Sequence, residues 1–410
     1  MGRFALLLKG GRTQTSGTDG PDRQDIAVGS DGRIAAIGAN LAPEGADRTI
    51  ELRDHLITPG LIDAHQHLDK SRTRHLVKNP LATLAGASAG YRALAANATR
   101  EEIAARAEHT LHTCVARGTV AIRNHTNIES DSGLRGLQAM IDLRERWRDR
   151  LTLQVVAHLT SDAPRKLAEC RTWMEGAIAA GADVIGGVPQ YADEPLAFLD
   201  LVFEYADKSG LPIDMHIDEH LDGRKALLDA VIDRTRAHGM QGRVTASHCC
   251  ALSSFPPSDA RRTIERLAEN DIAIITLPSA NLFLQGRDFE QCPPRGLTRI
   301  NELREAGVRV AAGSDNIQDP FIPIGSGDLL EIARWTMISG HFGLHDLGRA
   351  FDMVSTVPAA ILGLGPNWGI KIGARADLLI TDAQDIDDLV ATGPLNRAVV
   401  VGGKFVAGTL

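Results

Sequence analysis

Hydrophobic and polar positions divide the chain into terminal and central stretches with different rhythms. The first sixty residues contain short apolar runs, such as 24–29 and 33–38, which flank a Ser-Asp-Gly turn at 30–32. Glycine supplies the positive φ that hairpin turns require. The last forty residues repeat this rhythm, with apolar runs at 376–380 and 398–401. Because chain ends often meet in space, these segments predict one small β-sandwich domain built from both termini.

The middle of the chain alternates strand-like runs with helical segments. After the first gap the spacing settles near thirty residues, which is the size of a βαβ unit. Thr99 and Glu102 form a capping-box pattern, and residues 259–267 have a helical pattern. Eight such units predict an α/β fold, a (β/α)₈ TIM barrel, with an open doubly wound sheet as the alternative. The predicted strands are residues 61–65, 119–123, 153–157, 183–187, 212–216, 243–247, 272–276 and 308–312.

We expect the barrel to span residues 60–364 and the β-sandwich to combine residues 1–59 with 365–410. Catalytic residues of such barrels lie at the carboxyl ends of the strands. Chemically reactive residues end several of the predicted strands here, which places the chemistry on one face of the barrel. These strand ends are His65-Gln66-His67, Pro189-Gln190, His216-Ile217-Asp218-Glu219, Ser247-His248 and Ser314-Asp315-Asn316.

Four of these residues form a predicted metal site. His65 and His67 point to the same face of one strand, roughly 6.5–7 Å apart. His216 comes from the fifth strand, and Asp315 stands beside the first strand once the barrel closes. Three imidazoles and a carboxylate suit one divalent transition metal, with water in the remaining position. Zinc fits this ligand set best, and iron(II) and manganese are alternatives because metal availability often decides.

Two segments carry a family resemblance. Residues 57–69, Ile-Thr-Pro-Gly-Leu-Ile-Asp-Ala-His-Gln-His-Leu-Asp, resemble the opening barrel motif of the amidohydrolase superfamily, and residues 373–380 resemble its closing β-sandwich signature. Together with the strand ends above, they make the chain most similar to the cytosine deaminase branch over nearly its whole length. The resemblance implies a hydrolase of carbon–nitrogen bonds other than peptide bonds. No lysine ends the fourth strand, where other members hold two metals, so it also implies a single metal ion.

The resemblance assigns catalytic roles to Asp315, His248 and Glu219. Asp315 would bind the metal and accept a proton from a water whose pKa the metal lowers toward about 7. His248 would shuttle that proton, although the sequence alone also allows it to be a fourth histidine ligand. The Glu219 carboxylate can protonate a ring nitrogen and then the leaving amine. We therefore expect release of ammonia from an amino-substituted nitrogen heterocycle of the cytosine or modified-pyrimidine type.

Three further residues are expected to contact the substrate. Gln190 matches the glutamine that reads the amide edge of the ring in cytosine deaminases, and an amide offers both a donor and an acceptor. Asn316 replaces a second aspartate of those enzymes, and Phe321 replaces a tryptophan. Because asparagine donates as well as accepts, this exchange changes which ring substituents are accepted.

Other reactions and mechanisms stay open. Residues 67–71 also resemble the triazine alkylamine hydrolases, such as N-isopropylammelide isopropylamidohydrolase, so release of an alkylamine is an alternative, as is hydrolysis of a cyclic amide. Residues 86–90 match the G-x-S-x-G elbow of serine hydrolases, but residues 80–85 form a poor preceding strand. A metal-stabilised barrel that only binds a ligand is disfavoured because Glu219 and the four predicted metal ligands are all present.

Composition narrows the function classes further. The chain has 410 residues, 43% hydrophobic and 23% charged, with a net charge of −8, which is typical of a globular protein. Aromatic residues make up 4% and no basic stripe is visible, which argues against a nucleic-acid partner. No apolar run spans a bilayer, the N-terminal apolar run is typical of a strand and no signal peptide is apparent. Five cysteines without a C-x-x-C motif argue against disulfides. We expect a cytoplasmic homo-oligomer that binds a small nitrogen heterocycle.

Overall fold

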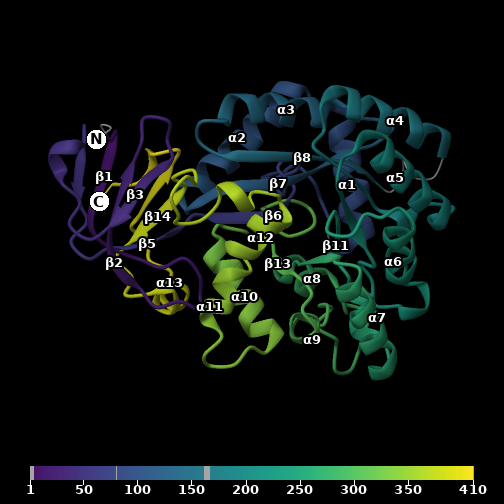
Figure 1. Cartoon of the computed structure of the whole chain (residues 1–410). Coiled ribbons are helices and arrows are strands. Elements are labelled where there is room, and N and C mark those ends of the chain that lie inside the picture. Colours follow the sequence, from purple (N-terminus) through teal and green to yellow (C-terminus); the bar gives the residue numbers. More distant parts are fainter. Residues whose placement is uncertain (1–3, 80, 161–166, 410) are drawn as a thin grey trace.

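The central part of the chain forms a barrel of eight parallel strands. The computed structural model describes residues 4–79, 81–160 and 167–409. Each strand is hydrogen-bonded to the next along the chain, from β6 to β13, and each predicted strand overlaps an observed one (Figure 1). These strands are β6 (Leu61–Gln66), β7 (Thr119–Ile128), β8 (Thr152–Leu159), β9 (Val184–Gly187), β10 (Ile213–Ile217), β11 (Val244–His248), β12 (Ala273–Thr276) and β13 (Val310–Ala312).

The barrel closes between its last strand and its first. Just beyond β13, the Asp315 backbone N–H donates to the His65 carbonyl, and the His67 N–H donates to the Asp315 carbonyl, both at 2.9 Å. Gln66 and Asp315 form a parallel bridge at the same level. Closure rules out the open doubly wound sheet and confirms the predicted fold class.

Helices cover the outside of the barrel. Helix α2 begins at the predicted capping box, in which Thr99 Oγ1 accepts from the Glu102 N–H and the Glu102 carboxylate accepts from the Thr99 N–H. The predicted helical residues 259–267 lie within α7. The helices are α1 (Leu84–Asn97), α2 (Arg100–Ala116), α3 (Arg135–Trp147), α4 (Leu167–Ala180), α5 (Pro195–Ser209), α6 (Leu228–Ala237), α7 (Pro257–Glu269), α8 (Pro278–Leu284), α9 (Ile300–Glu305), α10 (Leu329–Gly340), α11 (Leu347–Asp352), α12 (Thr356–Ile361) and α13 (Ile386–Thr392).

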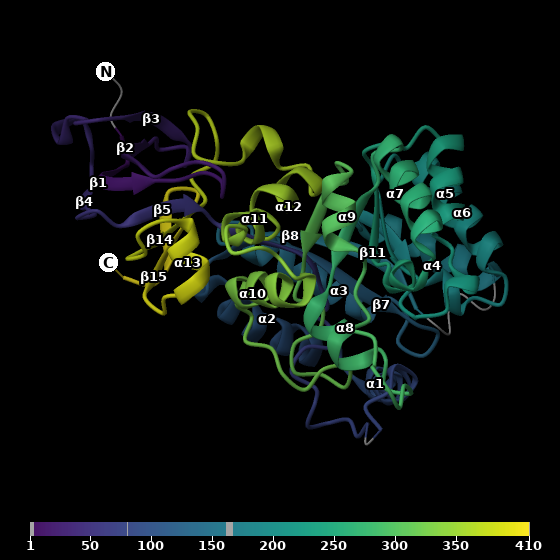
Figure 2. The ribbon, with the colours of Figure 1, turned by 90° about the horizontal axis from the view of Figure 1, so that it is seen from below.

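Both chain ends build one mixed sheet beside the barrel (Figure 2). Its order is β16-β15-β14-β5-β1-β2-β3, with β4 paired to β1. The two ends meet where β5 pairs antiparallel with β14, and the sheet has its own apolar core. The N-terminal strand begins at Leu6, and residues 1–3 lie outside the described residues. The strands are β1 (Leu6–Thr13), β2 (Asp22–Val28), β3 (Ile34–Gly38), β4 (Thr49–Glu51), β5 (Leu56–Pro59), β14 (Leu378–Thr381), β15 (Arg397–Val401) and β16 (Lys404–Ala407).

The G-x-S-x-G segment is not a nucleophile elbow. Residues 86–90 lie inside α1, whose first turn is capped by the Thr83 hydroxyl accepting from the Gly86 N–H. Between β6 and α1, the described residues 67–79 and 81–83 contain no strand, and residue 80 lies outside the described residues. A nucleophile elbow requires a sharp strand-to-helix turn, so the serine-hydrolase interpretation of Ser88 is wrong.

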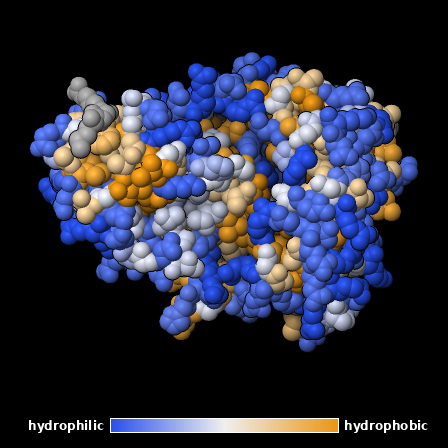
Figure 3. All heavy atoms as spheres, viewed as in Figure 1, coloured by the Kyte–Doolittle hydropathy of each residue, from blue (hydrophilic) through white to orange (hydrophobic). Residues whose placement is uncertain are grey.

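The visible surface is largely hydrophilic (Figure 3), and the cysteines are free. The face seen in Figure 3 is mostly hydrophilic, with a patch of apolar atoms over the terminal sheet. All five cysteines are described and each is a free thiol. Within the described ranges, every helix is too short or too polar to cross a bilayer.

Candidate metal and catalytic site

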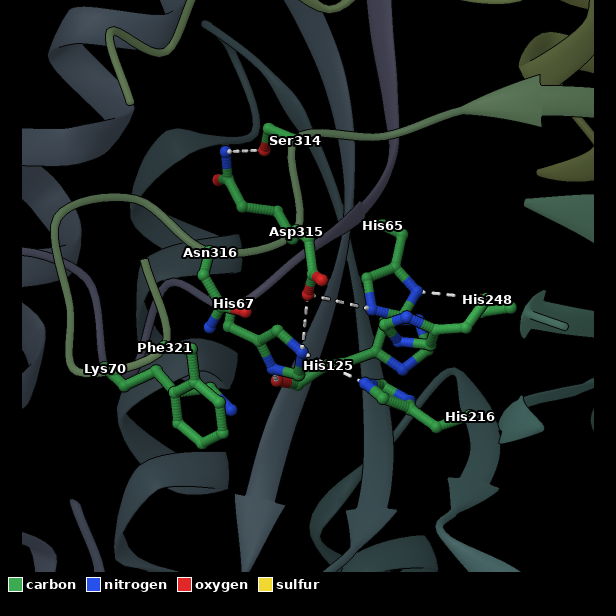
Figure 4. Close-up of polar contacts among 12 residues, drawn as sticks. His65, His67, Lys70, His125, His216, His248, Ser314, Asp315, Asn316 and Phe321 are labelled. Carbon is green, nitrogen blue, oxygen red and sulfur yellow. Dashed lines mark hydrogen bonds and ion pairs between the residues drawn. The ribbon is translucent and has the colours of Figure 1, made fainter. Parts of the chain in front are cut away.

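Four side chains converge at the carboxyl end of the barrel. His65 and His67 come from β6 and the residue after it, His216 from β10, and Asp315 from the loop after β13 (Figure 4). One ligand atom from each lies within 4.8 Å of those of the other three, and all four side chains are buried. Asp315 Oδ1 lies 3.5 Å from His65 Nε2 and 3.2 Å from His67 Nε2, and His67 Nε2 lies 3.1 Å from His216 Nε2. The structure thus brings the predicted metal ligands together.

The protonation of these groups suits a cation. Burial lowers the pKa of His67 to about 3 and that of His216 well below its usual value, so both imidazoles are neutral. Burial alone would raise the pKa of Asp315, but contacts with His65 and His67 hold it well below its usual value. His65 Nε2 has no hydrogen-bond partner among the described residues. Neutral imidazoles and an ionised carboxylate facing one point fit a divalent transition metal.

Three residues at the strand ends have an uncommon backbone conformation. Asp218, His248 and Asp315 have φ values of +54°, +70° and +59°. A non-glycine residue in this region is uncommon and tends to mark functional sites. Asp218 is held there because its carboxylate accepts from the backbone N–H groups of Leu227 and Leu228, at 2.8 and 3.1 Å. The bend between β10 and α6 that carries Glu219 is therefore fixed by a buried side chain.

Glu219 and His248 lie side by side near the four predicted metal ligands. His248 Nδ1 is 3.7 Å from Glu219 Oε1 and 3.0 Å from the amide nitrogen of Asn281. Burial and then the charge of Asp315 raise the pKa of Glu219 well above its usual value, which favours the protonated form of its carboxyl group. Burial lowers the pKa of His248 to about 3. The pair therefore offers a protonated acid and a neutral imidazole beside the cluster, as a general acid–base site requires.

A cavity of about 320 Å³ opens onto this cluster. His67, His216, His248, Asp315 and Glu219 line its inner part. One face of α1 lines another part of it with Leu84, Ala85, Ser88, Ala89 and Arg92. The remaining wall is formed by Lys70, Asn127, His158, Thr160, Val188, Tyr191, Asn316 and Phe321.

Two of the three predicted substrate contacts line the cavity, and the third does not. Asn316 and Phe321 line the cavity, and Asn316 Nδ2 donates to Asp319 Oδ2 at 2.6 Å. Gln190 is not part of the lining, and its amide is buried with no hydrogen-bond partner among the described residues. The short 3₁₀ turn over Pro189–Tyr191 instead brings Tyr191 to the cavity wall.

Lys70 is a cavity residue that sequence reasoning missed. Its side chain is buried, and Nζ lies 4.3 Å from the centre of the Phe321 ring and 3.3 Å from Asn127 Oδ1 (Figure 4). A buried ammonium beside an aromatic face and an open cavity can donate to a ligand oxygen. Its only sequence signal was its place in the motif at residues 67–71.

Known proteins resemble this chain over nearly its whole length. The family described as "Amidohydrolase family" matches residues 72–407. A pterin deaminase of Rhizobium rhizogenes is 32% identical over 96% of this chain and 90% of its own, and an N-isopropylammelide isopropyl amidohydrolase of Pseudomonas sp. is 29% identical over 93% of each. The structure of 5-methylcytosine deaminase from Klebsiella pneumoniae covers 98% of both chains, at 29% identity and a TM-score of 0.91. The chain belongs to the amidohydrolase family and is a hydrolase acting on carbon–nitrogen bonds.

Proposed function

We propose that the protein is a metal-dependent deaminase that replaces the amino group of a nitrogen heterocycle by a carbonyl and releases ammonia. The observation that carries this proposal is the placement of Glu219 and His248 beside the His65, His67, His216 and Asp315 cluster, in one cavity. The amidohydrolase family and its deaminase relatives support the same reaction class. We propose zinc as the metal, as the ligand types favour.

Asp315, Glu219 and His248 have different roles in the proposed reaction. A divalent cation held by the cluster would lower the pKa of a bound water and so supply the nucleophile at neutral pH. Asp315 would accept a proton from that water during attack on the ring carbon bearing the amino group. Glu219, whose protonated form is favoured by burial, would donate to the adjacent ring nitrogen. The resulting carboxylate would then take the hydroxyl proton of the adduct and pass it to the leaving amine, which departs as ammonia while the carbon becomes a carbonyl. The proton held by Asp315 would return to Glu219. His248 would donate from Nε2 to the attacking oxygen, because its Nδ1 accepts from the Asn281 amide.

The wall of the cavity favours a ring that carries an oxygen acceptor. The Lys70 ammonium can donate to a ring carbonyl oxygen while Phe321 packs on a face of the heterocycle. Asn316 adds an amide whose nitrogen is already donating to Asp319, which leaves its oxygen for a ring N–H or amino group. An aminopyrimidine ring with a carbonyl satisfies these groups.

The size of the cavity favours a second candidate within this class, a pterin. Its volume of about 320 Å³ equals the share of roughly ten water molecules in the liquid, which leaves room beyond a single ring. The small side chains of Ala85, Ser88 and Ala89 provide this room along α1. The pyrimidine half of a pterin presents the same amino-and-carbonyl edge, and one relative of this chain is a pterin deaminase. Release of an alkylamine from a triazine remains the alternative reaction, in line with another relative.

The test is product release by the zinc-loaded protein across a substrate panel. The panel holds cytosine, 5-methylcytosine, isocytosine, pterin, aminotriazines and N-isopropylammelide, with ammonia and alkylamine measured in parallel. Ammonia from a pyrimidine or a pterin supports the proposal and separates the two candidates. Alkylamine release without ammonia replaces it with the triazine reaction, and no release from any compound contradicts it.

A further inference from the structure

A line of buried polar side chains runs from the metal cluster into the barrel. His65 Nδ1 lies 2.9 Å from Ser247 Oγ, and Ser247 Oγ lies 3.0 Å from Asp214 Oδ1. Asp214 Oδ2 accepts from Arg123 Nη1 at 2.9 Å. These residues come from β6, β11, β10 and β7, and all four side chains are buried. Only His65 belongs to the predicted metal ligands.

The protons available for the hydrogen bonds of this line fix the tautomer of His65. A carboxylate only accepts, and a serine hydroxyl has a single proton, so Ser247 donates to Asp214. Ser247 Oγ must then accept from His65, which requires the imidazole proton to sit on Nδ1. Histidine binds a metal as the neutral imidazole, which has one N–H, so with that proton on Nδ1 the lone pair for the metal is on Nε2. That nitrogen lies 3.5 Å from Asp315 Oδ1, inside the metal cluster.

Arg123 fixes the inner end of the line. Its guanidinium always carries its charge and compensates the buried Asp214 carboxylate. Arg123 also donates from Nε to Gln154 Oε1 at 3.0 Å and from Nη2 to the Ile361 carbonyl at 3.3 Å. The carboxylate that orients Ser247 is thereby anchored at the point where β7, β8 and α12 meet.

The neighbouring ligand His67 is oriented in another way. Its Nδ1 lies 2.7 Å from the backbone carbonyl of His125, which only accepts, so the same tautomer is imposed by the main chain. Of these two histidines, only His65 is oriented through its Nδ1 by a side chain. Ser247 does not line the cavity, so replacing it changes one ligand's hydrogen bond without changing a substrate contact.

We propose that Arg123, Asp214 and Ser247 are positioning residues that hold His65 in the tautomer presenting Nε2, and thereby set the affinity of the cluster for its metal. The inference rests on the metal site of the proposed function and assigns the residues that tune it. Partners of this kind typically change metal affinity by about 10–100-fold when they are removed.

The test is zinc affinity, measured by competition with a chelator on the folded, full-length protein. Ser247→Ala should bind Zn²⁺ about 10–100-fold more weakly than the unsubstituted protein. Ser355→Ala is the matched control, because Ser355 is a buried serine that donates to the Gly60 carbonyl at 3.3 Å, away from this line. Ser247→Thr keeps the hydroxyl and should restore most of the affinity. Equal affinities for Ser247→Ala and the unsubstituted protein would overturn the inference.

A second measurement tests whether the residues act in series. If Asp214 acts through Ser247, combining Asp214→Asn with Ser247→Ala should weaken zinc binding no more than Ser247→Ala alone. Losses that multiply would overturn the serial arrangement. A protein without substitutions that binds no Zn²⁺ would instead contradict the proposed metal site itself, so the two failures are distinguishable.

Discussion

The backbone of Asp315 closes the barrel against His67, and the side chains of the same two residues meet in the cluster of predicted metal ligands. The His67 N–H donates to the Asp315 carbonyl at 2.9 Å, while Asp315 Oδ1 lies 3.2 Å from His67 Nε2. The separation of two predicted ligands is therefore set by main-chain hydrogen bonds of the fold. A site on such a rigid element is held more precisely than one on loops alone.

Replacing Glu219 should separate catalysis from metal binding. Glu219→Gln keeps the shape of the side chain but removes its proton-transfer group, so turnover should fall by about 10²–10⁴-fold. Zinc content should stay unchanged because Glu219 is outside the cluster. The measurements are kcat on the best substrate and metal content by mass spectrometry. Glu265→Gln, on the exposed face of α7, is the control. Normal turnover by Glu219→Gln would show that Glu219 is not the acid–base group.

Replacing Asp315 should damage both metal retention and rate. Asp315→Asn removes the only carboxylate of the cluster, so a charged ligand is lost while the barrel closure through its backbone remains. We expect the variant to lose most of its zinc during dialysis against a chelator under conditions in which the unsubstituted protein keeps it. Asp259→Asn on α7 should behave like the unsubstituted protein. Full zinc retention by Asp315→Asn would show that it is not a ligand.

Asn316 should control which ring edge is accepted. Asn316→Asp replaces an amide that lines the cavity by a carboxyl facing Asp319, with which the native side chain shares a 2.6 Å hydrogen bond. Because the new carboxyl replaces the amide nitrogen that donates to Asp319 by a second acceptor, ring edges that donate are favoured and preference should move toward cytosine. The measurement is the ratio of kcat/KM values for cytosine and for the best native substrate. An unchanged ratio would exclude Asn316 as a specificity residue.

Lys70 should contribute to substrate binding through its ammonium. Lys70→Met keeps an apolar stem beside Phe321 and removes the charged donor. Losing a hydrogen bond to a charged group costs about 1.5–3 kcal/mol, which corresponds to a loss of roughly 10–100-fold in kcat/KM. Zinc content and thermal stability should be measured alongside. A loss confined to stability, with kcat/KM unchanged, would reduce Lys70 to a packing role.

Asp319 should make folding stability depend on pH. Burial raises the pKa of Asp319 to about 7, although its carboxylate accepts from the Phe321 and Ile322 N–H groups. An acid whose pKa rises on folding stabilises the protein fully below its unfolded pKa of about 3.9, and this contribution is lost as the pH rises through about 7. The free energy of unfolding should therefore fall with pH in this window, by at most about 1.4 kcal/mol per pH unit from this group.

Asp319→Asn removes that titration and provides the measurement. Urea unfolding of the metal-free protein at about pH 5, 6, 7 and 8 should show a stability difference between the two proteins that changes across the window, with the variant gaining relative to the unsubstituted protein as pH rises. A difference independent of pH would mean that Asp319 does not titrate there.

The sequence by itself determined the fold class and the grouping of the four predicted metal ligands. Apolar runs at βαβ spacing fix where strands end, and in a closed parallel barrel all those ends lie on one face. His65, His67, His216 and Asp315 each sit at such an end, so their convergence follows from hydrophobic periodicity and closure. The family motifs added the proposed roles of Glu219 and His248.

Only the tertiary structure decided which loop residues face the cavity. Gln190 and Tyr191 are adjacent in one 3₁₀ turn, yet Tyr191 lines the cavity and Gln190 does not. Lys70 enters the cavity, and Ser88 lies on a helix face instead of an elbow. Strand side chains follow a period of two that can be read along a chain, whereas loop side chains follow dihedral angles set by distant contacts. For the same reason the line from His65 to Arg123 becomes visible only when the closed barrel brings the pair β6 and β7 opposite the pair β10 and β11.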